Sequence, residues 1–239
     1  ITMAWDGLSV LAVVPARGGS KGIPRKNLAT VAGRSLIACA ADVVRALPWI
    51  DRAVLSTDDA EIADEGRAHG LLVQFLRPAE FADDSATAAA AWAHAWRACE
   101  SQFGERYDVS LWLQPTSPLR RADEVERTLR AMLAGGHRAA ATISRVPAHH
   151  TPEKTLRMDD AGRLSFLHPE GARHGNRQSI PAYWTRNGIC YAVTRDTLLG
   201  HGWIVEQDCV GVVIAHAVAN IEEPIDLLFA EFLLERGIG

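Results

Sequence analysis

Apolar residues fall into short runs that alternate with longer stretches of helical periodicity. Buried strands are predicted where the runs are short and bounded by turn-forming residues, at 8–15, 52–57, 71–76, 108–114 and 139–144. Amphipathic helices are predicted between them, at 34–47, 59–69, 85–103 and 121–133. Strands that alternate with helices of this length form right-handed βαβ crossovers. We therefore expect an α/β fold with a mostly parallel sheet flanked by helices.

The alternation breaks between residues 146 and 183, where Pro, His, Gly and Arg are frequent. A weak strand pair is predicted at 155–157 and 164–166, with the turn Asp159-Asp-Ala-Gly162 between them. So long a stretch without a helix is usually functional in a compact α/β domain. We expect a single domain over 1–239, with an arm at about 146–183 that contacts a second subunit. Regular structure returns at 188–194, at 210–216 and in a helix at 224–236.

The helix predicted at 85–103 begins with a serine, Ser85, which is a favourable N-cap residue. Asp83 and Asp84 precede it closely and are interpreted as acids that the helix dipole favours near the first turn.

Composition narrows the class of protein. The 239 residues are 48% hydrophobic and 23% charged, as in ordinary globular proteins, and the net charge of −4 argues against a nucleic-acid binder. No apolar run approaches the roughly 20 residues that span a bilayer, so no membrane partner is expected. The first residues show no signal-peptide pattern, and the four cysteines form no CxxC pair. We expect a cytoplasmic protein with free thiols.

A glycine-rich basic loop, Pro15-Ala-Arg-Gly-Gly-Ser-Lys-Gly-Ile-Pro-Arg-Lys-Asn27, follows the first predicted strand. It holds two of the chain's three lysines, although the chain has 25 basic residues. Glycines allow close backbone approach, and successive N–H groups can form an anion-binding nest. A solvated basic turn is the alternative, but the carboxyl edge of an open α/β sheet favours phosphate binding. The loop matches neither GxxxxGK[ST] nor GxGxxG.

The run VVPARGGSKGIPRKN resembles the N-terminal motif of the acylneuraminate cytidylyltransferases, the CMP-sialic acid synthetases. Five further motifs follow in the order found in that family: Ser56-Thr-Asp58, Leu76-Arg-Pro-Ala-Glu80 with Ala82-Asp-Asp-Ser85, Leu113-Gln-Pro-Thr-Ser-Pro-Leu-Arg120, Asn176-Arg-Gln178 and Arg186-Asn-Gly188. They extend over about residues 10 to 235. The resemblance implies a Rossmann-like nucleotidyltransferase sheet and a homodimer formed through the arm.

The resemblance also implies which residues bind the nucleotide. Arg17 and Lys21 match residues that hold the triphosphate, and we take both as catalytic. The nucleotide-binding residues implied are Arg17, Gly18, Ser20, Lys21, Asn27, Arg77 and Ser85. Arg77 and Ser85 match contacts to the cytidine or its ribose, and Ser85 can serve as a helix cap as well.

An acidic keto sugar carries a carboxylate, so its site needs fixed cations and hydrogen-bond donors. By resemblance the sugar-binding residues are Gln114, Lys154, Arg177, Gln178 and Asn187. Lys154 is interpreted as reaching the neighbouring subunit's cleft. The alternative for Lys154 and Arg177 is pairing with nearby acids such as Glu153 or Glu170.

The metal site departs from the family pattern. Mg²⁺ is the implied cofactor, and the family carries an Asp-x-Asp pair before its last helix. Here Asn220 and Glu222 occupy the two places, with Glu223 and Asp226 close by. Mg²⁺ binds through one or two carboxylates plus phosphates and waters. Asn220 and Glu222 are therefore the predicted ligands, and Asp226 is expected in the first helical turn.

The predicted reaction is transfer of CMP from CTP to the anomeric hydroxyl of an N-acylneuraminate or related nonulosonate, releasing pyrophosphate. An alternative acceptor is the eight-carbon keto acid of lipopolysaccharide, or legionaminate or pseudaminate. A nucleotide-binding module without turnover is the alternative of another class.

Overall fold

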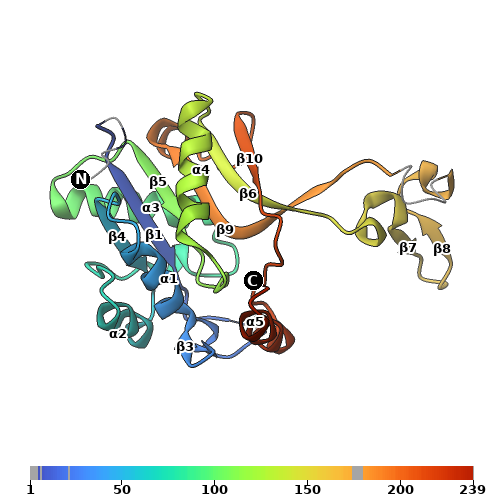
Figure 1. Ribbon diagram of the computed structural model, residues 1–239, viewed down its shortest axis with the longest axis horizontal. Helices are drawn as coiled ribbons and strands as arrows, with labels where there is room; N and C mark the ends of the chain where they lie inside the picture. Colours follow the sequence, from blue (N-terminus) through green and yellow to red (C-terminus); the bar gives the residue numbers. More distant parts are fainter. Residues whose placement is uncertain (1–4, 6, 21, 174–179, 239) are drawn as a thin grey trace. The chain divides into compact units, whose positions relative to one another are not determined.

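The computed structural model describes residues 5, 7–20, 22–173 and 180–238 (Figure 1). Contacts divide the chain into two compact units, one of residues 1–142 with 187–239 and one of residues 143–186. The smaller unit covers the stretch in which the arm is expected. Each unit is described by itself below.

A six-stranded sheet forms the main unit, in the order β10-β6-β9-β5-β1-β4. Its strands are β1 (Val10–Pro15), β4 (Arg52–Ser56), β5 (Val109–Trp112), β6 (Ala139–Arg145), β9 (Trp184–Thr194) and β10 (Cys209–Val213). β1 pairs in parallel with both β4 and β5, whereas β9 is antiparallel to β5. The predicted α/β fold with a mostly parallel sheet is confirmed.

Helices cover both faces of this sheet (Figure 1). They are α1 (Leu36–Arg45), α2 (Ala60–Ala68), α3 (Ala88–Phe103), α4 (Ala122–Ala134) and α5 (Pro224–Arg236), and a small hairpin of β2 (Thr30–Val31) and β3 (Arg34–Ser35) precedes α1. Alternate residues of β1 enter two cores. Val10, Ala12 and Val14 pack with α1, α2 and α4, and Leu11 and Val13 pack with α3. This alternation is what a central strand buried on both faces requires.

The prediction of a strand at 71–76 is wrong. Only Leu72 pairs with the sheet, through an isolated parallel bridge to Val54. Further along, the Arg77 N–H donates to the Thr57 carbonyl at 2.7 Å, beyond the end of β4. The segment therefore meets the edge of the sheet at separate points instead of along a ladder.

The start predicted for the third helix is also wrong. α3 begins at Ala88, and its N-cap is Thr87, whose hydroxyl accepts from the Ala90 N–H. Asp83 accepts hydrogen bonds from the Ser85 N–H, the Ser85 hydroxyl and the Ala86 N–H. Such side-chain-to-backbone bonds compete with helix formation, so Ser85 lies in a turn before the helix. Asp83 and Asp84 accordingly lie outside the first turn.

Replacing Thr87 with alanine should lower the free energy of unfolding by about 1 kcal/mol, because α3 loses its N-cap bond. Ser85→Ala is the matched control, and its loss should be smaller because its partners lie outside the helix. Urea denaturation of both variants measures the difference. A larger loss for Ser85→Ala would contradict the observed helix start.

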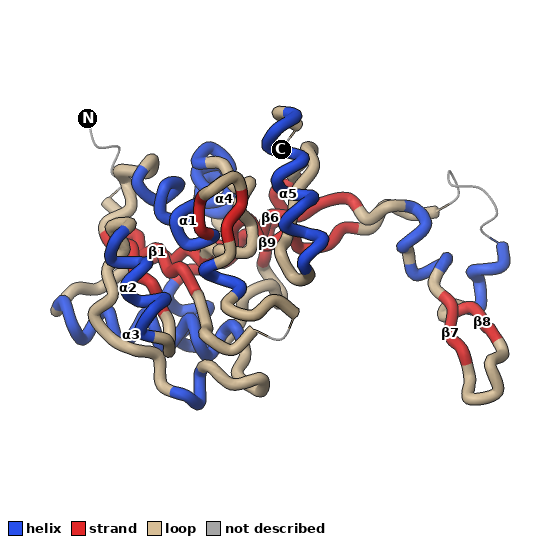
Figure 2. The backbone as a smooth tube through the Cα atoms, turned by 90° about the horizontal axis from the view of Figure 1, so that it is seen from below, coloured by secondary structure: helices blue, strands red, loops and turns tan. Residues whose placement is uncertain are grey.

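The smaller unit contains a two-stranded hairpin of β7 (Leu156–Met158) and β8 (Leu164–Phe166), seen in Figure 2. Asp159 accepts from the Ala161 and Arg163 N–H groups and so fixes the turn. The predicted strand pair and its turn are confirmed. Short 3-10 turns occupy Ala148–His150, Pro152–Lys154 and Pro169–Arg173.

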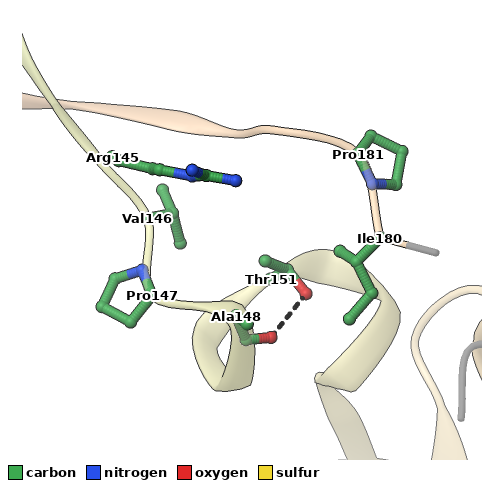
Figure 3. Close-up of a pocket in the computed structure, with 7 residues that line it drawn as sticks. All are labelled: Arg145, Val146, Pro147, Ala148, Thr151, Ile180 and Pro181. Atoms are coloured by element: carbon green, nitrogen blue, oxygen red, sulfur yellow. Dashed lines mark hydrogen bonds between the residues drawn. The ribbon is translucent and has the colours of Figure 1, made fainter. Parts of the chain in front are cut away.

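A pocket of about 170 Å³ lies within this unit (Figure 3). Among the described residues that line it, Arg145 is charged, and the others are Val146, Pro147, Ala148, Thr151, Ile180 and Pro181. The Thr151 hydroxyl donates to the Ala148 carbonyl at 3.0 Å. Among the described residues, no helix is both long enough and apolar enough to cross a bilayer.

Candidate active site

A cleft of about 350 Å³ opens in the main unit where β1 and β5 end. Of the described residues that were predicted for the site, six line it: Arg17, Ser20, Asn27, Arg77, Gln114 and Glu222. The other described lining residues are Pro15, Gly22, Lys26, Ala88, Trp112, Pro115 and Thr116. The cleft thus joins the predicted nucleotide residues to one predicted sugar residue and one predicted metal ligand.

Hydrogen bonds and ion pairs hold the basic loop in place at several points along its length. The buried Asn27 donates its amide N–H to the Arg17 carbonyl at 2.9 Å, which fixes the start of the loop. Arg25 forms ion pairs with Asp59, at 2.8 Å, and with Glu61. The Gly18 N–H donates to Asp58 at 2.9 Å. At Gly18, therefore, the predicted anion nest is filled by a carboxylate of the protein.

Gly22 is needed for close packing. A Cβ placed on it would lie 2.4 Å from the Glu222 carbonyl oxygen, closer than real Cβ contacts come. The segment before α5 therefore approaches the loop to a distance that only glycine permits.

Two loop cations meet carboxylates at the cleft. Arg17 bonds to Asp84 at 3.1 Å and to the Asp83 carbonyl at 3.2 Å. Lys26, whose side chain is 15% exposed, pairs with Glu222 at 2.6 Å. Partly exposed ion pairs of the Arg17–Asp84 kind contribute little stability, so a triphosphate can replace the aspartate. Lys21 lies outside the described residues.

Arg77 is only 6% exposed. Its guanidinium donates to the Ser56 hydroxyl at 3.0 Å and to the Ser56 carbonyl at 2.5 Å. Burial lowers the pKa of Arg77 to about 10, so it stays charged at neutral pH. A fixed buried guanidinium at the cleft wall suits the predicted contact to a nucleoside. Ser85 is exposed and is not among the cleft-lining residues, so its nucleotide role stays a prediction.

The predicted sugar residues are distributed unevenly. Gln114 lines the cleft, while Asn187 is buried and accepts from the Ile189 N–H at 3.3 Å. Lys154 ends a 3-10 turn of the smaller unit. Arg177 and Gln178 lie outside the described residues.

The predicted metal ligands lie beside one another. The Asn220 amide donates to Glu222 at 3.2 Å, and Glu222 is the carboxylate that faces the cleft. Asp226 accepts from the Glu222 and Glu223 N–H groups at 2.8 Å, so it caps α5, in whose first turn it lies as predicted. Among the described residues no group of three or more His, Cys, Asp or Glu side chains is arranged to hold a metal. One carboxylate and one amide oxygen fit Mg²⁺ only if phosphates supply further ligands.

Trp112 is a cleft residue that the sequence pattern did not single out. It is buried, and its indole N–H has no hydrogen-bond partner among the described residues. Its ring packs on Trp92 at 5.3 Å, and the Trp92 N–H is by contrast bonded to the Ser110 hydroxyl. The apolar run at 108–114 predicted a buried strand with Gln114 as the site residue at its end, and nothing in the run distinguished Trp112 from the buried residues around it.

The fold and cleft define a Rossmann-like α/β nucleotide-binding protein. Residues 11–149, more than half of the chain, match the family model described as "Cytidylyltransferase". The chain is 30% identical over 236 residues to CMP-N,N'-diacetyllegionaminic acid synthase of Legionella pneumophila. The aligned region covers 95% of this chain and 97% of the relative. It is 27% identical over 226 residues to a pseudaminic acid cytidylyltransferase of Campylobacter jejuni, covering 93% and 95%.

The fold resembles that of a solved CMP:2-keto-3-deoxy-manno-octonic acid synthetase in complex with CTP, with a TM-score of 0.70. The two chains are 18% identical, over 96% of this chain and 99% of the other. This chain belongs to the cytidylyltransferase family, and the resemblance drawn from its motifs to the CMP-sialic acid synthetases is confirmed.

Proposed function

We propose that this enzyme transfers CMP from CTP to the anomeric hydroxyl of a nonulosonic acid and releases pyrophosphate. The observation that carries the proposal is a cleft lined both by cations, namely Arg17 and Lys26 of the loop and the buried Arg77, and by Gln114. Relatives of similar length are named for pseudaminic and legionaminic acid, which supports an acidic nine-carbon acceptor.

The proposed reaction forms a bond from the sugar hydroxyl oxygen to the α-phosphorus, breaks the bond from that phosphorus to the bridging oxygen of pyrophosphate, and releases the hydroxyl proton to water. Negative charge then grows on the departing pyrophosphate. Arg17, together with Lys21, stabilises that charge, and preorganised cations are effective because they need not reorient during the reaction. Arg77 holds the nucleoside in place, since its guanidinium is fixed by Ser56. Positioning and electrostatics suffice, so no side chain has to act as a nucleophile.

Mg²⁺ remains the proposed cofactor. Bound beside the phosphates, it would polarise their oxygens as a Lewis acid. Glu222 and Asn220 are the residues that would hold it. Lys26 now neutralises Glu222, so it would have to turn toward the phosphates when the metal binds.

The acceptor is best identified by initial rates of pyrophosphate release with CTP, Mg²⁺ and a panel of keto sugars. Pseudaminate, legionaminate, N-acetylneuraminate and the eight-carbon keto acid of lipopolysaccharide make up the panel. We expect a nine-carbon acid to give the highest kcat/KM. Preference for the eight-carbon acid would support the alternative acceptor, and CTP binding without release by any sugar would support a module without turnover.

We propose that two copies form a homodimer. Ile225, Leu228, Phe229 and Phe232 recur on one face of α5 at helical spacing and are exposed, Ile225 and Leu228 at 62% each. The arm hairpin also exposes Leu156, Met158, Leu164 and Phe166. Monomers rarely expose large contiguous apolar patches. Lys154 would then act in the partner's cleft, and light scattering should give twice the 26.0 kDa chain mass.

We propose a cytoplasmic location as well, supported by four cysteines that are all free thiols.

A further inference from the structure

Arg120 is a buried cation at the junction of two strands, and the proposed mechanism does not use it. Its side chain is among the buried groups, at 5% exposure. Nε donates to the Ile189 carbonyl and Nη2 to the Gln114 carbonyl, each at 2.5 Å. Nη2 also lies 3.4 Å from the Gly188 carbonyl. One guanidinium therefore joins the end of β5 to the first half of β9.

These contacts fall where the ladder between the two strands stops. The described β5–β9 pairs end with Trp112 opposite Tyr191. Continued by two residues, the same antiparallel register would place Gln114 opposite Ile189. In a regular antiparallel ladder, every second pair of opposite residues bonds through its own N–H and C=O groups. Here the carbonyls of Gln114 and Ile189 both accept from Arg120, so the guanidinium sets the distance between the two strand ends.

The strand ends that Arg120 joins carry cleft residues. Gln114 lines the cleft, and Gly188, with a φ of +78°, lies against it. A Cβ on Gly188 would lie 2.8 Å from the Gln114 Oε1 atom and 2.9 Å from the Ser117 hydroxyl oxygen. The Gln114 carboxamide thus has no spare room on the β9 side. A small change in the distance between β5 and β9 would move it.

Burial of the Arg120 side chain carries a free-energy cost. No described carboxylate forms an ion pair with it, and its Nη1 has no hydrogen-bond partner among the described residues. Removing a guanidinium from water carries a large desolvation penalty, and even buried ion pairs can often be replaced by apolar residues without loss of stability. A role beyond stability therefore explains this residue better than packing does.

We propose that Arg120 is a positioning residue for the acceptor sugar, acting through Gln114. By holding the Gln114 carbonyl to β9, it keeps the Gln114 carboxamide against Gly188 and directed to the cleft. The proposal rests on the proposed function, in which Gln114 contacts the sugar.

A double-mutant cycle tests whether Arg120 acts through Gln114. Arg120→Lys keeps the charge but loses the planar fork, and it should raise the KM for the sugar about tenfold. The Kd for CTP, measured by calorimetry, should stay within about twofold. In a Gln114→Ala background, Arg120→Lys should change kcat/KM for the sugar by less than about twofold, because the residue it positions is gone. If the two substitutions lowered kcat/KM for the sugar independently, so that their fold-changes multiplied in the double variant, the proposal would be overturned.

Two further variants guard against a general loss of structure. Arg121→Lys, at the neighbouring exposed position, is the matched control and should leave the KM for the sugar unchanged. Gly188→Ala should raise that KM as Arg120→Lys does, because its Cβ displaces Gln114 directly. An unchanged KM in Gly188→Ala would count against the proposal.

A crystal structure of the ligand-free Arg120→Lys protein separates this proposal from the proposed function. Displacement of the Gln114 carboxamide from Gly188 supports the positioning role, and an unmoved carboxamide overturns it. Wild-type protein that releases no pyrophosphate with any sugar would refute the proposed function but leave this structural result intact.

Discussion

Replacing Gly22 with alanine should lower kcat/KM for CTP about a hundredfold. The added Cβ would lie 2.4 Å from the Glu222 carbonyl oxygen, and both groups are backbone or attached directly to it. The loop and the segment before α5 must therefore move apart. Displacing catalytic groups by on the order of 1 Å can cost about a hundredfold in rate. Steady-state pyrophosphate release with the preferred sugar measures the effect.

Gly19→Ala is the control, because Gly19 lies three residues away in the same loop. A Cβ built there meets no atom within 4 Å, and its φ is not in the left-handed region. We expect kcat/KM within about twofold of wild type. If both alanine variants lost activity equally, close approach of the loop backbone to the phosphates, and not the contact with Glu222, would be the reason for the glycines.

Arg17→Gln should lower kcat/KM for CTP by about a hundredfold or more, comparable to the loss of one oxyanion donor. Arg17 lines the cleft, and a triphosphate can replace the Asp84 carboxylate that it now pairs with. Its charge is needed most when pyrophosphate departs. The effect should therefore appear in kcat as well as in KM, since Arg17 binds the triphosphate of the substrate and its interaction strengthens as pyrophosphate departs. Single-turnover rates at saturating CTP measure the chemical step directly.

Arg25→Gln removes the same charge from the same loop. Arg25 does not line the cleft, and its guanidinium is bound to Asp59 and Glu61. Exposed pairs of this kind contribute at most about 1 kcal/mol, so we expect less than about a fivefold loss. Equal losses in the two variants would mean that overall loop charge, and not the placement of Arg17, governs catalysis.

The order of strands and helices could be predicted because it depends on local periodicity. β1, β4 and β5 each form within a predicted apolar run, and α5 has the predicted bounds of 224 and 236. The run at 71–76 was equally apolar, but a strand also needs a partner along its length, and only Leu72 has one. The start of α3 failed for a different reason, because Asp83 binds the Ser85 and Ala86 N–H groups and forms a turn.

The candidate site could be predicted in part. The basic loop and Gln114 follow strands that end at one edge of the sheet, so periodicity was enough to bring them together. The pairing of Lys26 with Glu222 joins residues 196 positions apart, and no local pattern indicates it. The bridge from Arg120 to Gln114 and Ile189 depends in the same way on the distance between two strand ends.

Position-specific labelling of CTP tests the central claim most directly. The protein is incubated with Mg²⁺, the preferred keto sugar and CTP labelled at either the α- or the γ-phosphorus. Attack on the α-phosphorus predicts that the α label enters a CMP–sugar, while the γ label appears in pyrophosphate in a one-to-one ratio. Release of the γ label as inorganic phosphate, or retention of both labels in CTP with every sugar of the panel, would contradict cytidylyl transfer.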